Sequence, residues 1–522
     1  MKNHDPQQNS DQTNKKQIQH HQQRQQQQQQ LFSIPAQELK EKLDSQQPIM
    51  VLDIGEQERY AKKHIPGSAC AVCNETTKQT VMPKLPKDIE IVLVNDDEGY
   101  ARNVAAMMHQ AGFLNVYYLE GGLDSWTGRF EESIDSDITP LELKHSLEKR
   151  KGKNGFEDDK GSILLLDVRT PEEYAEWHIE GSINIPLQEL SSKQAIERIS
   201  KDKEIVTICA HGNRSKVAKF IFQRYGYRVK SLEGGMNAWT TAFEDSSSFD
   251  LKEDEDVALV QVRRIGKGCM SYVLAEKNGE AAVFDPVFPV EHYVDVAARY
   301  NAKITKVYDT HQHADHISGA NTLSEKTDAE VFVSAYEGYE VKDDGQKSTN
   351  FIHDADTYTI SNITIQAIHT PGHTAGSFSF LIGNEFLITG DTLFVDGVGR
   401  PDLRDKAKEF AVMLYDSLHR RILSLSENLL ILPAHIDRGD ATKSGELMSA
   451  PLYKINNNQQ LLKLNKDEFV KQITSKVRPT PVNYRQIVAI NKQMIQIAET
   501  DIQAIEMGPN RCSISSSPSS IL

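Results

Sequence analysis

The sequence predicts a multidomain α/β protein. Its first half is expected to fold as open sheets with helices on both faces, and its second half to be richer in strands. Three observations lead to this prediction. The first half is duplicated, each copy alternates short apolar runs with helical stretches, and the chain becomes β-rich from about residue 257. Such alternation is typical of parallel α/β sheets, and 522 residues suffice for roughly three or four domains.

The duplication covers a whole domain length. Residues 60–67 (YAKKHIPG) correspond to 174–181 (YAEWHIEG), and 119–122 (LEGG) correspond to 232–235, at offsets of 113 or 114 residues. A constant offset over such a length is typical of an internal repeat. We therefore expect two domains of the same fold in succession.

Composition sets the remaining boundaries. The first thirty residues are polar and Gln-rich, and the C-terminus is Ser-rich. Such segments cannot bury a core, and the acidic stretch after residue 244 has the composition of a solvated linker. The predicted segments are a disordered tail 1–31, domains 32–131 and 137–244, a linker 245–256, a third domain 257–505 and a second disordered tail 506–522.

Net charge and hydropathy restrict the kinds of partner that the protein can bind. The formal net charge is −15 and the pI about 5.6, which disfavours a nucleic-acid-binding surface. No apolar run has the length of a membrane-spanning helix, and the N-terminus lacks the apolar core of a secretory signal. We expect no nucleic-acid or membrane partner and a cytoplasmic location, with the mitochondrial matrix left open. Homo-oligomer formation is also left open.

A cysteine follows an apolar run in the second repeat. Residues 205–208 (IVTI) predict a buried strand, the loop 209–215 (CAHGNRS) follows, and a helix is expected after Arg214. At a helix N-terminus, backbone N–H groups and the helix dipole favour a thiolate and can hold a persulfide or an oxyanion. Arg214 adds a fixed positive charge. Cys209 and Arg214 are therefore the predicted catalytic residues of this domain.

The first repeat lacks that cysteine. Its strand 91–94 runs into Asn95, followed by three acids at 96–98. An amide cannot carry a persulfide, and the acids would repel anionic substrates. We predict a catalytically dead copy with a scaffold or docking role.

On these motifs, both repeats resemble rhodanese domains. Four residues separate Cys209 from Arg214, whereas cysteine phosphatases have five, and the tighter loop resembles that of sulfurtransferases that bind sulfane sulfur. The resemblance implies two rhodanese-like α/β domains, each with a parallel sheet. The first would be degenerate and the second active.

The other cysteines carry less weight. The chain has five cysteines and no secretory signal, so we expect a reducing compartment and no disulfide framework. The pair Cys70 and Cys73 is interpreted as two small residues in a strand or loop. Cys269 is assigned a packing role.

The second half contains six histidines and two acids in four short motifs. The motifs are 310–316 (THQHADH), 369–374 (HTPGHT), 390–392 (GDT) and 433–435 (PAH). Neutral imidazoles and carboxylates are the ligands that hold zinc or iron. Each motif follows a predicted strand, so we expect the motifs to meet at one edge of a rigid sheet.

These motifs resemble the metallo-β-lactamase fold, specifically its glyoxalase II and persulfide dioxygenase branch, over residues 257–440. The resemblance implies an αββα sandwich, in which two mixed sheets pack face to face with helices outside. For a persulfide dioxygenase it further implies one Fe(II) per chain, held by His311, His373 and Asp391. Two histidines and one carboxylate with open positions are typical of non-haem iron oxygenases.

The alternative within the same fold is a two-zinc thioester hydrolase of the glyoxalase II type. It would activate a water shared by both ions. Its ligands would be His311, His313 and His373 for one ion and Asp315, His316 and His435 for the other, with Asp391 as the bridge. With one iron, His313, Asp315, His316 and His435 would instead orient the ligands and substrate.

Two features favour the dioxygenase. Arg400, in Gly-Arg-Pro-Asp, resembles a family element whose arginine lies near iron and substrate, so we predict that it binds substrate. A sulfane-sulfur carrier fused to a persulfide oxidase is also chemically sensible, whereas a thioester hydrolase has no use for Cys209. One departure is Asp437, which stands where mitochondrial-type members have tyrosine.

The sequence therefore predicts a persulfide dioxygenase that converts glutathione persulfide, or a similar low-molecular-weight persulfide, and O2 to sulfite. Cys209 would transfer sulfane sulfur and form or use thiosulfate, so that both activities remove reactive sulfide. A third hypothesis, from a different functional class, is a sulfur-relay or sensing module whose metal is purely structural.

Overall fold

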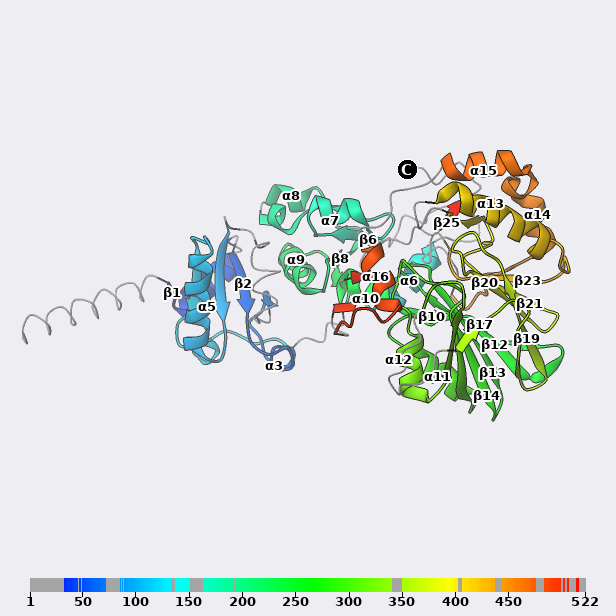
Figure 1. The fold of residues 1–522 in the computed structure, drawn as a ribbon. Helices are drawn as coiled ribbons and strands as arrows, with labels where there is room; N and C mark the ends of the chain where they lie inside the picture. The colour runs from blue at the N-terminus through cyan, green and yellow to red at the C-terminus, as the bar shows by residue number, and fades with distance from the viewer. Residues whose placement is uncertain are drawn as a thin grey trace, which may run out of the picture. The chain divides into compact units, whose positions relative to one another are not determined.

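The computed structural model of the chain (Figure 1) describes residues 32–45, 47, 49–71, 85, 87, 89–132, 137–150, 163–191, 193–339, 350–401, 406–436, 444–475, 483–498, 501–502, 505–506 and 513–515. Internal contacts divide the chain into two compact units, Met1–Ala238 and Trp239–Leu522. The predicted tail 1–31 lies outside the described residues.

The first repeat is a five-stranded parallel sheet in the order β1-β5-β4-β2-β3. The central strands are buried because both sheet faces are covered, as their continuous apolar runs predict. The elements are β1 (Ser33–Ile34), α2 (Ala36–Asp44), β2 (Ile49–Asp53), α3 (Gln57–Lys62), β3 (Ser68–Cys70), β4 (Glu90–Val94), α5 (Glu98–Gln110) and β5 (Val116–Leu119).

The second repeat has the same core topology. Its parallel sheet runs in the order β7-β6-β8-β9, which is the order β3-β2-β4-β5 of the first repeat. The duplication predicted from the sequence is therefore confirmed. The elements are α6 (Pro140–Arg150), β6 (Ile163–Asp167), α7 (Pro171–Glu176), β7 (Ile183–Asn184), α8 (Lys193–Glu197), β8 (Glu204–Ile208), α9 (Asn213–Arg224), β9 (Val229–Ser231) and α10 (Gly235–Thr241).

The second unit contains two mixed sheets. The first runs in the order β10-β12-β13-β14-β15-β16-β17, with β11 also pairing with β12. Its strands and helices are β10 (Phe243–Asp245), β11 (Phe249–Leu251), β12 (Asp254–Arg264), β13 (Met270–Glu276), β14 (Glu280–Phe284), α11 (Glu291–Arg299), β15 (Lys303–Tyr308), α12 (Ala320–Thr327), β16 (Glu330–Ser334) and β17 (Asn350–Ile352).

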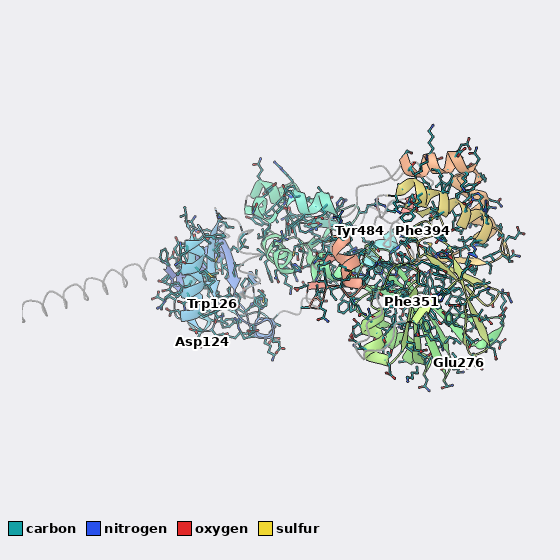
Figure 2. The ribbon with its side chains drawn as sticks, viewed as in Figure 1. Asp124, Trp126, Glu276, Phe351, Phe394 and Tyr484 are labelled. Atoms are coloured by element: carbon teal, nitrogen blue, oxygen red, sulfur yellow. The ribbon has the colours of Figure 1, made fainter. Side chains whose placement is uncertain are left out.

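The other sheet runs in the order β18-β19-β20-β21-β23-β24. Several C-terminal helices follow it, and Figure 2 labels Tyr484, the first residue of α16. The elements are β18 (Thr357–Ile360), β19 (Ile363–His369), β20 (Phe378–Ile382), β21 (Phe386–Gly390), β22 (Gly397–Gly399), α13 (Ala407–Ser417), β23 (Leu430–Pro433), β24 (Ala450–Pro451), α14 (Leu452–Asn458), α15 (Lys466–Ser475), α16 (Tyr484–Asn491) and β25 (Ser513–Ser515).

Three apolar clusters make this unit an αββα sandwich. Phe284 and Tyr308 of the first sheet pack with Phe380 of the second, so the central cluster lies between the sheets. A second cluster lies between the first sheet and the helices α11 and α12. A third lies between the second sheet and α13, α14 and α15. Figure 1 shows these helices outside the sheets, as the sequence predicts.

Two predicted boundaries differ from the structure. The expected linker 245–256 lies in β10, β11 and the start of β12, because its acidic side chains alternate with residues such as Leu251 that face the core. The expected tail 506–522 begins with buried Glu506. It also contains β25, which pairs with β22, since ladder hydrogen bonds require no apolar side chains.

Within the described residues, no helix combines the length and apolar character needed to cross a membrane.

Candidate active sites

The metal-ligand candidates follow strand ends, as the sequence predicts. His311 lies just beyond the end of β15, Asp391 follows β21, and His435 is two residues beyond β23. His373 lies in the turn that follows β19. Since β15 belongs to one sheet and the other strands to the second, the candidates come together at one edge of the sandwich.

Three of these side chains form a group that could hold a metal ion. His311 Nε2 lies 3.7 Å from Asp391 Oδ2, and His373 Nε2 lies 3.4 Å from the same oxygen. All three side chains are buried, and none of these three atoms has a hydrogen-bond partner within the described part of the chain. Buried polar atoms without partners are costly, so a shared ligand such as a cation fits the arrangement.

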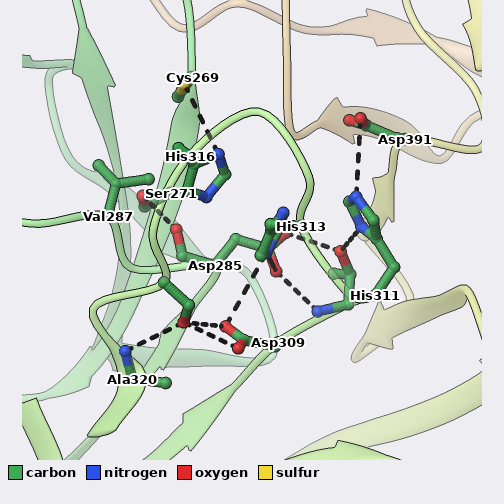
Figure 3. A network of polar contacts seen from close by, with 12 residues as sticks. Cys269, Ser271, Asp285, Val287, Asp309, His311, His313, His316, Ala320 and Asp391 are labelled. Atoms are coloured by element: carbon green, nitrogen blue, oxygen red, sulfur yellow. Dashed lines mark hydrogen bonds and ion pairs between the residues drawn. The ribbon is translucent and has the colours of Figure 1, made fainter. Parts of the chain in front are cut away.

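A hydrogen-bond relay sets the tautomer of His311. Thr310 Oγ1 donates its hydrogen to Asp285 Oδ2 at 2.9 Å and lies 2.9 Å from His311 Nδ1. Because the hydroxyl has one hydrogen, His311 Nδ1 must donate to Thr310 Oγ1. The lone pair of His311 Nε2 is therefore free and is aimed at Asp391 (Figure 3).

A backbone carbonyl sets the tautomer of His373. His373 Nδ1 donates to the carbonyl oxygen of Arg400 at 2.9 Å, which leaves Nε2 free to bind a metal. The preceding residue, Gly399, lies against the backbone of Asp391, and a Cβ there would lie 1.9 Å from the carbonyl oxygen of Asp391. Close packing around the ligand candidates thus explains the glycine without any contact to substrate.

Three further candidates, Asp315, His316 and His435, form a second buried group with Cys269. Asp315 Oδ1 lies 3.1 Å from His316 Nδ1, and His435 Nε2 lies 3.0 Å from Asp315 Oδ2 without hydrogen-bond geometry. Burial alone would lower the pKa of His435, but the carboxylates of Asp391 and Asp315 raise it well above its ordinary value. The ring Nδ1 of His435 contacts Asp391 Oδ1 at 2.5 Å.

His313 lies between two acids and the ring of His311. Its Nε2 is 3.2 Å from Asp285 Oδ1 and 3.9 Å from Asp309 Oδ1, so it forms a third group with these two acids (Figure 3). The centroids of the His311 and His313 rings are 4.3 Å apart. The Nδ1 of His313 has no hydrogen-bond partner in the described ranges.

The predicted cysteine loop lies between β8 and α9. Cys209 is buried at the end of β8, and its Sγ accepts a hydrogen bond from Gly212 N at 3.1 Å. Its Sγ also lies 3.5 Å from Ser215 Oγ. Gly212 has a φ of +90°, a conformation that favours glycine. The sulfur therefore faces a backbone N–H at a helix N-terminus, as the sequence predicts.

Arg214 is buried and paired. Its Nη1 and Nη2 bind the two carboxylate oxygens of Glu173 at 2.9 and 2.8 Å. Glu173 also closes the capping box of α7 with Thr170. Sequence reasoning missed Glu173, although the Thr-Pro-Glu-Glu signal of a capped helix start was visible.

The corresponding loop of the first repeat is one residue shorter. Three residues, 95–97, separate β4 from α5, whereas four residues, 209–212, separate β8 from α9. Asp96 Oδ2 lies 2.8 Å from Arg59 Nε, and Asp97 caps α5 by accepting from Gly99 N at 2.8 Å. The loop's acids are thus held by the domain's own cation and backbone.

Other predicted residues have mixed outcomes. Arg400 is buried, and its carbonyl accepts a hydrogen bond from His373; its role in substrate binding stays a prediction. Cys269 packs in the second group, where nearby His435 and His316 overcome the effect of burial and lower its pKa to about 6. Cys70 is buried at the end of β3. Cys73, Cys512, Asp402 and Asp437 lie outside the described residues.

Asp285 is the main residue that sequence reasoning missed at the metal edge. It accepts from Thr310 N at 2.7 Å, from Thr310 Oγ1 at 2.9 Å and contacts His313 Nε2 at 3.2 Å. Its φ is +50°, which aspartate tolerates better than most residues. The available signal was its position at the end of a predicted strand, shared with the ligand candidates.

Comparison with known proteins agrees with this architecture. Residues 35–129 and 149–242 each match the rhodanese-like domain family, and residues 264–436 match the metallo-beta-lactamase superfamily.

Individual relatives include proteins with different activities. The mitochondrial persulfide dioxygenase ETHE1 of Mus musculus is 27% identical over 219 residues, which cover 41% of this chain and 80% of the relative. The cytoplasmic hydroxyacylglutathione hydrolase of Arabidopsis thaliana is 36% identical over 135 residues, which cover 24% and 50%. Among solved structures, ETHE1 from Myxococcus xanthus is 26% identical with a TM-score of 0.38, covering 45% of this chain and 97% of that one.

Proposed function

Because the chain consists of two rhodanese-like domains followed by a metallo-beta-lactamase superfamily domain, we propose that it is an iron-dependent persulfide dioxygenase with sulfurtransferase activity. Its substrate would be glutathione persulfide or a similar low-molecular-weight persulfide. One persulfide, one dioxygen and one water would give the thiol, sulfite and two protons. The compartment stays the cytoplasm predicted from the sequence, although the mouse relative is named as mitochondrial.

The observation that carries the proposal is the group of His311, His373 and Asp391. Two imidazole nitrogens and one carboxylate oxygen, all buried and without hydrogen-bond partners among the described residues, face one another. This donor set fits Fe(II). An iron(II) ion held there would supply open positions for a persulfide sulfur and dioxygen. Asp285, through Thr310, and the Arg400 carbonyl hold the two imidazoles in the required tautomers.

One contact at Asp391 fits a single metal. Asp391 Oδ1 is engaged by His435 Nδ1 at 2.5 Å, so Oδ2 is the oxygen left for a metal beside His311 and His373. His316 is also turned so that its Nδ1 meets Asp315. These contacts favour a role for His435 and His316 in holding carboxylates.

The second candidate function is a two-zinc thioester hydrolase. It is favoured by the partner-free His313 Nδ1 and His316 Nε2 in the described part of the domain, and by the hydroxyacylglutathione hydrolase among the relatives. It predicts two zinc ions per chain and turnover without oxygen.

The rhodanese-like loop supports the sulfur-transfer step. The Cys209 thiolate would take the outer sulfur of a persulfide, which releases the thiol and leaves a cysteine persulfide. Sulfite would then take that sulfur, giving thiosulfate and restoring the thiolate. The Gly212 N–H donates to the sulfur, and Glu173 fixes the Arg214 guanidinium beside the loop.

A pair of variants separates the two activities. His311→Ala should lose bound iron and oxygen uptake with glutathione persulfide, while thiosulfate formation from added persulfide and sulfite persists. Cys209→Ser should lose thiosulfate formation and keep oxygen uptake. Loss of oxygen uptake in Cys209→Ser would contradict the two-site proposal.

A further inference from the structure

The loop that carries most of the ligand candidates has backbone groups bonded outside regular structure. Between His313 and Ser318, five backbone groups pair with only three side chains. Lys267 Nζ donates to the Asp315 carbonyl at 2.9 Å. The other four groups pair with Asn491 and Glu506, which lie more than 170 residues further along the chain.

Asn491 makes three bonds to the loop. Its Nδ2 donates to the carbonyl oxygens of His313 and His316, both at 3.0 Å, and its Oδ1 accepts from Ser318 N at 2.9 Å. Asn491 is buried at the C-terminal end of α16. Both amide hydrogens and the amide oxygen are thus used to fix backbone that no helix or strand fixes.

Glu506 makes the fourth bond and is itself anchored. Its Oε1 accepts from Ile317 N at 2.5 Å, and its Oε2 lies 2.7 Å from Arg264 Nη1. Both Glu506 and Arg264 are buried. Burying a carboxylate is costly unless an opposite charge and hydrogen bonds compensate its desolvation. Here Arg264 supplies the charge at Oε2, and Ile317 N supplies the hydrogen bond at Oε1.

An apolar cluster adds to these polar contacts. Ile317 of the loop packs with Ile487 of α16 and with Ile502. The C-terminal segment therefore contacts the loop through side chains of both kinds. Without these partners, the buried loop backbone would have to take other hydrogen bonds, and the imidazoles would lose their fixed positions.

We propose that Asn491 and Glu506 are positioning residues for the metal centre. They fix the 313–318 loop, which begins two residues after His311 and carries His313, Asp315 and His316. The proposal rests only on the metal-binding part of the proposed function, and it gives the C-terminal segment a role in metal binding.

The test compares three variants of the full-length protein. Asn491→Leu removes three loop bonds, while Glu506→Gln keeps an acceptor for Ile317 N but loses the charge opposite Arg264. Ile473→Ala opens a cavity under α15, in the third apolar cluster, and touches no group of the loop. For each variant we would measure the affinity for Fe(II) and for Zn(II) under anaerobic conditions. Thermal unfolding and hydrogen exchange of amides 313–318 would be measured in the metal-free protein.

Asn491→Leu should bind metal at least about tenfold more weakly, and its loop amides should exchange faster. Glu506→Gln should unfold at a lower temperature yet bind metal within about threefold of wild type. Ile473→Ala should also unfold earlier with unchanged metal affinity.

Unchanged affinity in Asn491→Leu would overturn the inference, as would an equal loss in Ile473→Ala. A wild type that binds neither metal would overturn both the inference and the proposed function. A wild type that binds metal but takes up no oxygen with glutathione persulfide would sink only the proposed function. If Asn491→Leu fails to fold, Asn491→Asp takes its place, because it keeps the acceptor for Ser318 N and loses both donors to the loop carbonyls; unchanged metal affinity in that variant would overturn the inference.

Discussion

Replacing Asp285 with asparagine should change the tautomer of His311 without unfolding the domain. In the wild type, the Thr310 hydroxyl donates to Asp285 Oδ2, so His311 Nδ1 carries the proton. The asparagine oxygen must stay at the Oδ1 position, because the Thr310 N–H points there. The amide nitrogen then replaces Oδ2 and donates to the Thr310 hydroxyl.

The hydroxyl hydrogen must now point at His311 Nδ1, which becomes an acceptor. The proton of His311 then moves to Nε2 and blocks the lone pair that faces Asp391. Metal binding must reverse this change, so we expect about 10- to 100-fold weaker iron binding. Stability should fall by less than about 1.5 kcal/mol, since one hydrogen bond is reversed rather than lost. Asparagine also tolerates the φ of +50° at this position.

Two measurements check this prediction. Anaerobic titration gives the Fe(II) affinity, and the ¹⁵N shifts of the His311 ring nitrogens in the metal-free protein give the tautomer. Thr310→Ser is the matched control, because it keeps the hydroxyl and should bind iron like the wild type. Wild-type affinity in Asp285→Asn, with the proton still on Nδ1, would refute the relay.

Two further predictions concern the rhodanese-like domains. Glu173→Gln should cost about 1–2 kcal/mol of stability and lower sulfur transfer several-fold, because the buried Arg214 loses the partly buried carboxylate that binds it through both oxygens; unchanged transfer kinetics would contradict this. Asn95→Cys in a Cys209→Ser background should not restore sulfur transfer, because the first loop is shorter and its Asp96 is paired with Arg59. Recovered thiosulfate formation in that double variant would show that the first repeat is merely missing a thiol.

The sequence predicted the strands well because each is a short apolar run that ends at a marked turn. Residues 91–94 and 205–208, for example, correspond to β4 and β8. The ligand candidates could also be predicted, because each follows such a strand. The segment 245–256 could not be predicted as a strand, since its acidic and serine residues conceal a three-residue strand in which Phe249 and Leu251 pack against the core.

Contacts between residues distant in sequence account for the rest. Nothing near His313 in the sequence indicates that Asn491 and Glu506 supply its loop's hydrogen bonds. Arg400 illustrates a different limit. Its motif was recognisable, but only the fold reveals that its carbonyl contacts His373. Motif spacing identifies side chains that can bind a metal, whereas the groups that orient them depend on tertiary structure.

Metal content and oxygen uptake, measured on one preparation of the wild type, test the central claim most directly. The proposed enzyme should contain about one iron per chain and, with glutathione persulfide, consume one dioxygen for each sulfite or thiosulfate formed. Two zinc ions per chain, with hydrolysis of a glutathione thioester and no oxygen uptake, would contradict it.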